Sequence, residues 1–509
     1  MVVRLAGLCC ALWLLSAPAG AAAPGWPERL DPVVRRAMAD WQAPGLALAV
    51  LRGGEVAALR AWGVRDVETG APVTPRTVFA LGSITKTLTA VGIALLADEG
   101  KLAWDAPAIR ALPSLRFATG AMTRTVSLRD LMSHRTGMAR HDALWYFGVH
   151  DAAGLLARLR FLPPSAPAGT VYQYNNLMVA VAGYAAAHAA GTGWADFTRA
   201  RLLRPLGMTE TALSAAAFRA APERATGYYP ADAGREPIPL RDTDAVAPAA
   251  AAYAPVTDAA KLLRFLLREG AAADGTTLVS AAALAELRRR AMARPDTSRV
   301  APFRVTGYGA GLYIGIFRNA PIHWHWGAID GYAGMLSFRP ETRDGVVVLT
   351  NLSGRNPVPT LVTLAAYDAL DGRDPAIWPG LYGARPSAAE RAPPICPATD
   401  GAAHPRDDYL GTYEHPAYGR AEILAEPDDL LVLHLHGRAV RLDGCGGDAW
   451  MVRDGAWPIR EGLVVRFARD ADGRVKALAA AIADGPTYRL NPGPLVFRRA
   501  ERPDGRRSN

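Results

Sequence analysis

The sequence predicts an α+β domain followed by a small all-β domain. Over residues 24–378, short apolar runs typical of strands alternate with longer apolar stretches typical of helices. Residues 379–408 are rich in Pro, Gly, Ala and Ser without periodicity, which indicates a linker. Short strand-like runs separated by turn residues then predict a small antiparallel sheet or barrel over residues 409–500, before a tail at 501–509. A length of 509 residues with 50% apolar content supports two cores.

The first predicted element is a hairpin, in which residues 46–51 and 56–62 flank Arg52-Gly-Gly54. Residues 87–100 are apolar on all sides and end at a glycine, which predicts a buried central helix. Further helices are predicted at 126–132, 177–190 and 258–269, and further strands at 308–317, 334–338, 345–349, 409–414, 421–424, 430–435, 462–467 and 475–481.

Residues 1–23 predict a signal peptide. Arg4 gives a charged start, residues 5–15 form an apolar stretch too short to span a bilayer, and residues 19–23 form a small-residue cleavage region. The alternative is an uncleaved membrane anchor. No later segment approaches the roughly 20 apolar residues of a membrane helix. We therefore expect a periplasmic or secreted protein with no membrane span after signal removal.

Export leaves two cysteines, Cys396 and Cys445, because Cys9 and Cys10 belong to the signal peptide. In an oxidising compartment the pair could form a disulfide, and two unpaired thiols are the alternative. Neither cysteine has the C-x-x-C spacing of a metal site.

The composition argues against nucleic acid and metal. The net charge of +9 comes from arginines scattered among acidic residues, so we expect no nucleic-acid partner. His323 and His325 alternate on a predicted strand, as do His434 and His436, but no third ligand is evident for either pair. We expect no metal and no other cofactor.

Ser83-Ile-Thr-Lys86 is the clearest chemical motif. The chain has four lysines among its 57 Lys and Arg residues, so a position that keeps Lys is a candidate for a role that Arg cannot fill. A desolvated Lys can lose its proton and act as a base, whereas Arg stays protonated. Positions i and i+3 share a helix face, which places the amine beside the hydroxyl, as in a lysine-activated serine nucleophile. The alternative is a helix-start serine with a solvated lysine one turn later.

Six blocks in order resemble the class C β-lactamase and penicillin-binding-protein-like serine hydrolases, over about residues 30–370. This resemblance implies an antiparallel sheet flanked by helices plus a helical subdomain (β-lactamase/transpeptidase-like). The blocks are Gly82-Ser-Ile-Thr-Lys86, residues 131–138, Val171-Tyr-Gln-Tyr-Asn-Asn176, Pro205-Leu-Gly-Met-Thr209, Tyr308-Gly-Ala-Gly311 and His325-Trp-Gly327.

Residues 411–419 are similar to the lipocalin-like domain that follows the hydrolase in the archaeal oligomeric D-peptidases. This second resemblance rests on one block. It implies a lipocalin-like β-barrel at 409–500 and allows a homo-oligomer that forms through the C-terminal domain.

The first resemblance also implies the catalytic residues. Ser83 would attack the carbonyl carbon, with Lys86 as the proton acceptor. Tyr174 corresponds to the second acid/base, and Asn176 would hold Lys86 and the substrate amide. The alternative for the last two is a packed tyrosine and a helix-capping asparagine.

The third motif, His325-Trp-Gly327, implies the rest of the cleft. The backbone N–H groups of Ser83 and Ala328 would bind the oxyanion, and Gly327 would let substrate backbone approach the strand. Relatives often have Lys where this chain has His325, which removes a permanent cation from the substrate-carboxylate site. The aromatic residues 145–147 could floor a substrate pocket, or they could pack in the core.

These residues predict an exported serine hydrolase that is acylated at Ser83 and cleaves an amide or ester bond of a small peptide, as a D-aminopeptidase, carboxypeptidase or esterase does. One alternative is a class C-like β-lactamase, which shares the first chemical step. Another is a non-catalytic cell-wall or ligand-binding module, against which the set Ser83, Lys86, Tyr174 and His325 argues. The sequence contains no G-x-S-x-G, the motif of the α/β-hydrolases.

Overall fold

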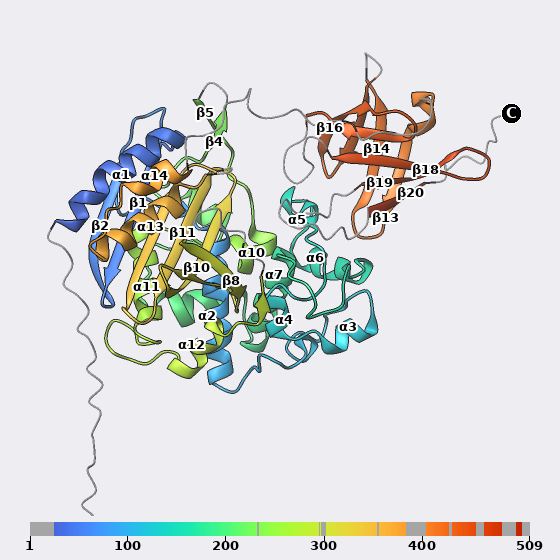
Figure 1. Ribbon diagram of the computed structural model, residues 1–509. Helices are drawn as coiled ribbons and strands as arrows, with labels where there is room; N and C mark the ends of the chain where they lie inside the picture. The colour runs from blue at the N-terminus through green and yellow to red at the C-terminus, as the bar shows by residue number, and fades with distance from the viewer. Residues whose placement is uncertain are drawn as a thin grey trace, which may run out of the picture.

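The computed structural model describes residues 25–231, 234–294, 296, 302–353, 356–382, 396, 404–426, 430–454, 463–480 and 495–500 (Figure 1). The predicted signal peptide at 1–23, most of the predicted linker at 379–408 and the tail at 501–509 lie outside these residues. An open eight-stranded sheet and a closed barrel organise the described chain.

The open sheet is antiparallel and has the strand order β2-β1-β12-β11-β10-β9-β8-β7. The predicted hairpin at its edge is confirmed, and Gly53 and Gly54 make the turn with positive φ angles. The strands are β1 (Gly45–Arg52), β2 (Glu55–Gly63), β7 (Met292–Ala293), β8 (Phe303–Tyr308), β9 (Tyr313–Phe317), β10 (Ala320–Ile329), β11 (Tyr332–Arg339) and β12 (Asp344–Thr350).

Helices cover both faces of this sheet (Figure 1). The side chains at positions 46, 48 and 50 of β1 share a core with α1 (Trp26–Trp41) and α13 (Val358–Leu370). Those at positions 47, 49 and 51 share the other core with α11 (Val256–Leu267). This alternation follows from the two-residue period of a strand, and it explains why β1 is apolar throughout.

The predicted central helix is confirmed as α2 (Thr85–Asp98), in which every residue from Thr85 to Leu96 is buried. A 3₁₀ turn, Gly82–Ile84, leads into it. The helices predicted at 177–190 and 258–269 are α7 (Asn176–Ala189) and α11. The helix predicted at 126–132 is shorter, since α4 (Leu128–Met132) begins only after a capping box formed by Ser127 and Asp130.

The other described helices are short. They are α3 (Gly120–Thr125), α5 (Ala143–Tyr146), α6 (Ala152–Arg158), α8 (Trp194–Thr198), α9 (Ala215–Arg219), α10 (Ala247–Ala250), α12 (Ala281–Arg288) and α14 (Ile377–Tyr382). Two small strand pairs accompany them, β3 (Phe79–Ala80) with β6 (Tyr253–Ala254) and β4 (Tyr228–Ala231) with β5 (Gly234–Pro237).

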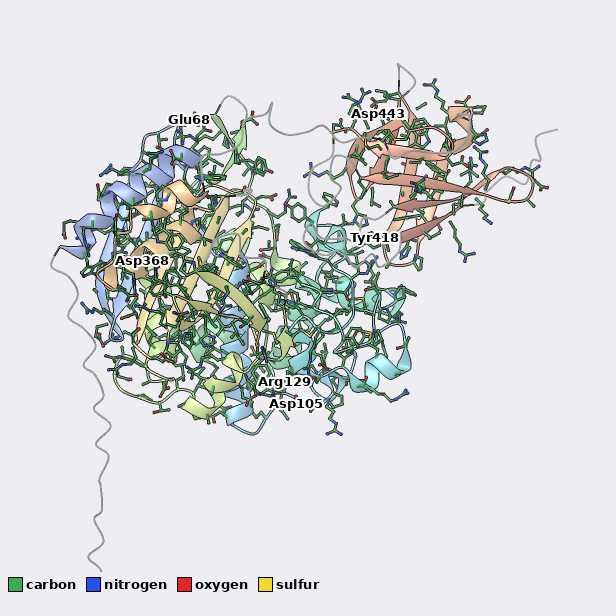
Figure 2. The ribbon with its side chains drawn as sticks, in the orientation of Figure 1. Glu68, Asp105, Arg129, Asp368, Tyr418 and Asp443 are labelled. Atoms are coloured by element: carbon green, nitrogen blue, oxygen red, sulfur yellow. A yellow bond between two sulfur atoms is a disulfide. The ribbon has the colours of Figure 1, made fainter. Side chains whose placement is uncertain are left out.

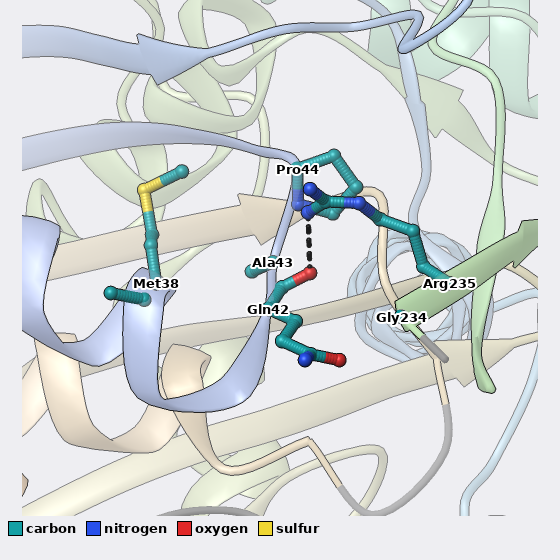
Figure 3. Close-up of a pocket in the computed structure, with 7 residues that line it drawn as sticks. Met38, Gln42, Ala43, Pro44, Gly234 and Arg235 are labelled. Atoms are coloured by element: carbon teal, nitrogen blue, oxygen red, sulfur yellow. Dashed lines mark hydrogen bonds between the residues drawn. The ribbon is translucent and has the colours of Figure 1, made fainter. Parts of the chain in front are cut away.

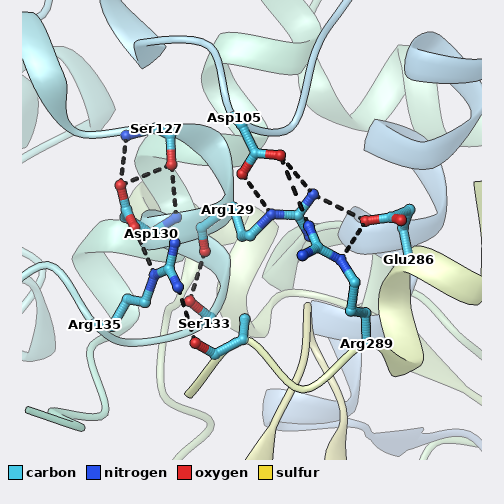
Figure 4. A network of polar contacts seen from close by, with 9 residues as sticks. Asp105, Ser127, Arg129, Asp130, Ser133, Arg135, Glu286 and Arg289 are labelled. Atoms are coloured by element: carbon cyan, nitrogen blue, oxygen red, sulfur yellow. Dashed lines mark hydrogen bonds and ion pairs between the residues drawn. The ribbon is translucent and has the colours of Figure 1, made fainter. Parts of the chain in front are cut away.

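A cluster of ion pairs joins α4 to the end of α12 (Figure 4). The Arg129 side chain is 4% exposed and pairs with Asp105 at 2.6 Å and with Glu286 at 2.9 Å. Arg289 extends the cluster by a 2.9 Å bond to Glu286. A buried guanidinium needs such partners to offset its desolvation. The cluster therefore fixes α4, which leads into the 131–138 block.

The strand predicted at 308–317 is two strands, β8 and β9, because a glycine turn interrupts it. Gly309 N donates to Leu312 O at 2.9 Å, and Gly311 has a φ of +69°. A Cβ at Gly311 would lie 2.7 Å from Lys86 O. The turn therefore requires glycine for its conformation and for its approach to α2.

The C-terminal sheet closes into an eight-stranded antiparallel barrel, β13 to β20 in order. The sequence patterns missed β16, β17 and β20. A disulfide joins Cys396 to Cys445. The strands are β13 (Gly411–His415), β14 (Gly419–Ala425), β15 (Leu431–Leu435), β16 (Arg438–Gly444), β17 (Ala449–Val452), β18 (Val464–Arg469), β19 (Val475–Ala480) and β20 (Leu495–Arg499).

Candidate active site

Ser83 and Lys86 lie side by side at the start of α2. Ser83 is partly exposed in its 3₁₀ turn, whereas Lys86 is fully buried. Lys86 Nζ lies 2.9 Å from Ser83 Oγ, 2.7 Å from Asn176 Oδ1 and 2.9 Å from the carbonyl oxygen of Ala249. The two carbonyl oxygens can only accept hydrogen bonds. A neutral amine that donates to both therefore turns its lone pair toward the Ser83 hydroxyl.

The surroundings of Lys86 favour this neutral form. Burial lowers the pKa of Lys86 well below its ordinary value, and the nearby Arg140 guanidinium lowers it further, while the Asp142 carboxylate opposes them. The amine can therefore accept a proton at a pH where an exposed lysine could not. The alternative of a solvated lysine one turn after a capping serine does not describe this residue.

Tyr174, just before α7, contacts Ser83. Its hydroxyl donates to Ser83 Oγ at 2.7 Å, and its ring lies 5.0 Å from Lys86 Nζ. The residue that caps α7 is Asn175, whose side chain accepts from Met178 N. The side chain of Asn176 is therefore not used for capping. It is directed to Lys86 instead.

Asp142 is a residue of the site that the sequence interpretation missed. Its Oδ1 accepts from Asn176 Nδ2 at 3.1 Å and from Trp145 Nε1 at 2.9 Å, and its Oδ2 accepts from Arg140 Nε at 2.5 Å. Asn176 thus has its amide oxygen on Lys86 and its amide nitrogen on Asp142. This arrangement fixes the amide orientation, although the sequence interpretation expected Asn176 to hold the substrate amide as well.

His325 lies on β10 and is buried. Its Nδ1 faces Trp326 O at 2.6 Å, and its Nε2 lies 2.8 Å from Tyr308 Oη. A carbonyl oxygen can only accept, so Nδ1 carries the hydrogen and Nε2 accepts from the tyrosine. Burial, with a smaller effect from Lys86, lowers the pKa of His325 to about 3. The ring is therefore neutral at physiological pH, and both nitrogens have partners.

Strand β10 passes directly beside the nucleophile turn. β9 pairs with β10 only as far as Trp324, so residues 325–329 continue beyond that pairing. A Cβ at Gly82 would lie 3.0 Å from Ala328 N, which places this amide next to the turn that carries Ser83. Ala328 is exposed and Ser83 is partly exposed, so the two residues expected to bind the oxyanion through their amides both reach the surface.

The structure gives Gly327 a role in the fold. A Cβ at this position would lie 1.9 Å from the carbonyl oxygen of Leu81, an impossible approach. Gly327 is therefore required by the packing of β10 against the chain just before Ser83, and the approach of a substrate backbone to this strand stays a prediction.

Trp145 and Tyr146 are buried, so core packing describes them better than the floor of an open pocket. Tyr146 is also bonded to a polar group close to Ala328 in the chain. The Tyr146 hydroxyl donates to Asp330, two residues after Ala328, and Arg241 holds the same carboxylate at 2.8 Å.

A separate hollow of about 340 Å³ lies between the end of α1 and β5 (Figure 3). Figure 3 shows one hydrogen bond among the lining residues, in which Arg235 Nη1 donates to Gln42 O at 2.8 Å. None of the predicted catalytic residues lines this hollow. The arrangement around Ser83 is therefore the better candidate for the active site.

Within the described part of the chain, no group of three or more His, Cys, Asp or Glu side chains could hold a metal ion. The described residues also contain no helix that is long and apolar enough to cross a membrane.

A partly exposed serine bonded to a buried lysine and a tyrosine, at the start of the central helix and beside an antiparallel sheet, defines a β-lactamase-like serine hydrolase. Residues 30–371 match the family model described as Beta-lactamase, and the chain belongs to that family. Residues 397–491 match a domain of unknown function, DUF3471.

Known relatives agree with this assignment. The chain is 30% identical to an unguisins hydrolase from Aspergillus campestris over 423 residues, which are 77% of this chain and 76% of that protein. It is also 30% identical to penicillin-binding protein 4 from Amycolatopsis lactamdurans, over 64% of this chain and 84% of that one. The fold is similar to that of the octameric penicillin-binding protein homologue from Pyrococcus abyssi, with a TM-score of 0.59, 22% identity and coverage of 89% and 98% of the two chains.

Proposed function

We propose that the protein is an exported serine hydrolase that forms an acyl-enzyme at Ser83 and cleaves amide or ester bonds of small peptides. The observation that carries this proposal is the position of Ser83 Oγ, 2.9 Å from Lys86 Nζ and 2.7 Å from Tyr174 Oη. The oxygen thus has a proton acceptor on one side and a proton donor on the other.

The chemistry follows from these contacts. Lys86 takes the Ser83 proton as Oγ attacks the substrate carbonyl carbon, and the N–H groups of Ser83 and Ala328 bind the oxyanion. Tyr174 then gives its hydroxyl proton to the leaving amine or alcohol. The proton that Lys86 took from Ser83 passes to Tyr174 and restores its hydroxyl. Water attacks the resulting ester, with the same two side chains accepting and returning its proton, and releases the acid and free Ser83.

The neutral His325 favours peptide amides and esters over β-lactams. A β-lactam brings a carboxylate next to its acylating carbonyl, and a lysine in the third motif would offer that carboxylate a fixed positive charge. His325 offers none, because its ring is neutral and its Nε2 accepts from Tyr308. The β-lactamase alternative therefore lacks its usual cationic partner at this position.

Two observations support the proposals on location and assembly. A disulfide between Cys396 and Cys445 suits an oxidising compartment, as expected of a periplasmic or secreted protein. The Pyrococcus abyssi protein of similar fold is described as octameric, which supports a homo-oligomer, and we propose that it forms through the barrel.

Acylation identifies the nucleophile. Incubation with a slow acylating reagent should add one acyl group to the intact mass, and peptide mapping should place the group on Ser83. Ser83→Ala should abolish both the adduct and hydrolysis, because the attacking oxygen is removed. Ser133→Ala is a matched control, since its hydroxyl only donates to Arg129 O within the fold. An adduct on any other residue contradicts the assignment.

Substrate preference tests the second half of the proposal. The measurement is kcat/KM for a D-amino-acid p-nitroanilide and a short-chain p-nitrophenyl ester against a chromogenic cephalosporin. We expect the anilide or the ester to react faster and penicillins to acylate Ser83 slowly. If the cephalosporin reacts faster by a wide margin, the peptidase or esterase hypothesis is wrong and the β-lactamase alternative takes its place.

A further inference from the structure

The barrel contacts the hydrolase part at the segment that leads into α5. Tyr418 Oη lies 3.0 Å from His141 Nδ1, and His436 Nδ1 lies 3.0 Å from the carbonyl oxygen of Ala143. Tyr418 lies at the end of the barrel nearest the α5 region (Figure 2). These two bonds bracket Asp142, the residue that holds Asn176.

The contact between Tyr418 and His141 is buried on both sides, with exposed fractions of 1% and 3%. His141 has a φ of +50°, a strained conformation for a residue with a side chain. Its Nε2 has no hydrogen-bond partner among the described residues. The Tyr418 hydroxyl therefore supplies the bond that holds this buried imidazole, and breaking it would leave a buried polar group unsatisfied.

His436 fastens the same segment from a second direction. Its Nδ1 faces Ala143 O, and its Nε2 faces the carbonyl oxygen of Tyr418 at 2.6 Å. Both oxygens can only accept, so a ring nitrogen that carries a hydrogen donates it to the oxygen that it faces. The His436 ring also stacks on the Tyr418 ring, with 5.9 Å between centroids. The two barrel side chains thus act as one unit.

From this unit an unbroken path leads to the nucleophile. His141 and Ala143 fix the backbone on either side of Asp142. Asp142 bonds Asn176 at 3.1 Å, and Asn176 bonds Lys86 at 2.7 Å. A shift of the backbone at 141–143 would therefore move the carboxylate that orients Asn176.

We propose that Tyr418 and His436 are positioning residues for the hydrolase reaction, holding Asp142 in place and through it Asn176 and Lys86. This inference rests on the proposed function of Ser83 and Lys86. It assigns the barrel a part in catalysis through contacts with the hydrolase domain, without contact to the substrate.

Tyr418→Phe in the full chain is the sharpest test, because it keeps the ring and removes the hydroxyl. We expect kcat to fall about 10-fold, the size of one lost buried hydrogen bond, with KM changed less than about 2-fold. The Asp142 carboxylate raises the pKa of Lys86, so its release should also move the rising limb of the pH profile to lower pH. His436→Ala should have the same effects in the same directions.

Two barrel variants serve as controls. Tyr413 is also buried, but its hydroxyl donates to Tyr409 O at 2.7 Å inside the barrel, so Tyr413→Phe should leave kcat and the pH profile unchanged. His434→Ala changes another histidine of the same hairpin that takes no part in the bonds above. An equal loss of kcat in Tyr413→Phe would attribute the effect to barrel stability and overturn the proposal.

Hydrogen exchange gives a readout that does not require activity. Leu144 N donates to His141 O at 3.1 Å, and Tyr146 N donates to Asp142 O at 2.9 Å. Both amides should exchange faster in Tyr418→Phe and not in Tyr413→Phe. If kcat, the pH profile and the exchange rates of Tyr418→Phe all equal those of the wild type, the inference is overturned. If Ser83 proves not to be acylated in the wild type, the proposed function fails on its own evidence.

Discussion

Lys86 shows how a single residue acquires a function that its sequence motif only suggests. Its amine is fully buried and has two carbonyl acceptors and one hydroxyl around it. The acceptors fix the direction of the amine, and burial favours its neutral form. Arginine could satisfy neither condition, because it keeps its proton and its donors lie in a plane.

Lys86→Arg should therefore be inactive although the charge is retained. The expected loss in kcat/KM is about 10²–10⁴-fold, as for removal of a general base. Lys261→Arg is a matched control, because Lys261 bonds Asp258 and Gly207 O away from Ser83. Near-wild-type turnover of Lys86→Arg would leave Lys86 only a structural role.

The pH profile of the wild type reports on the same amine. Proton acceptance needs neutral Lys86, so kcat/KM should rise as the pH increases through the pKa of this residue. Because burial lowers that pKa, the rise should occur well below 10.5. Initial rates measured from pH 5 to pH 10 test this expectation, and a rise centred near 10.5 would contradict it.

At the scale of elements, the site depends on the close approach of β10 to the turn before α2. Two glycines permit this approach. A Cβ added at Gly82 would meet the backbone of Ala328, and a Cβ added at Gly327 would meet the carbonyl oxygen of Leu81. Backbone cannot move aside as the end of a side chain can. The absence of a Cβ at these two positions therefore sets the distance between the Ser83 and Ala328 amides, the proposed oxyanion donors.

Gly327→Ala should consequently separate β10 from the nucleophile turn. We expect a loss of about 1–3 kcal/mol in the free energy of unfolding, as for overpacking, and a larger proportional loss of kcat than of KM. Gly444→Ala is the control on a strand, since its Cβ would meet only the Trp450 ring, at 3.7 Å. Urea unfolding and initial rates separate the two effects. Full activity in Gly327→Ala would show that the approach is not required.

Sequence reasoning reached the elements whose signals are local. The apolar stretch of α2 and the hairpin turn at Gly53 were predictable, because each follows from a short run of residues. The place of Asp142 in the site was not predictable. Two of its partners, Arg140 and Trp145, are near in sequence, but its link to the site is Asn176, which lies far along the chain. The packing requirement at Gly327 was not predictable either, because only the fold brings Leu81 beside it.

For the whole molecule, the buried histidines connect the fold to pH. Burial lowers the pKa of His141 and of His325 to about 3 and that of His323 to about 4, from an ordinary value of 6.5. The unfolded chain therefore binds protons near pH 6.5 that the folded chain binds only near pH 3 to 4. Stability from these groups is complete above about pH 7 and is lost as the pH falls through this window.

We accordingly expect acid unfolding to begin well above the range in which carboxylates titrate. At pH 5 each of the three histidines should cost about 2 kcal/mol relative to pH 7, and together they approach a typical domain stability of about 5–15 kcal/mol. Urea midpoints measured between pH 7 and pH 4.5 test this. His323→Phe removes one titrating ring whose Nδ1 has no partner in the described structure, so the variant should lose less stability over the same range. A wild-type midpoint that stays constant down to pH 5 would mean that these rings take up protons at the same pH in the folded and the unfolded chain, and the expectation would be wrong.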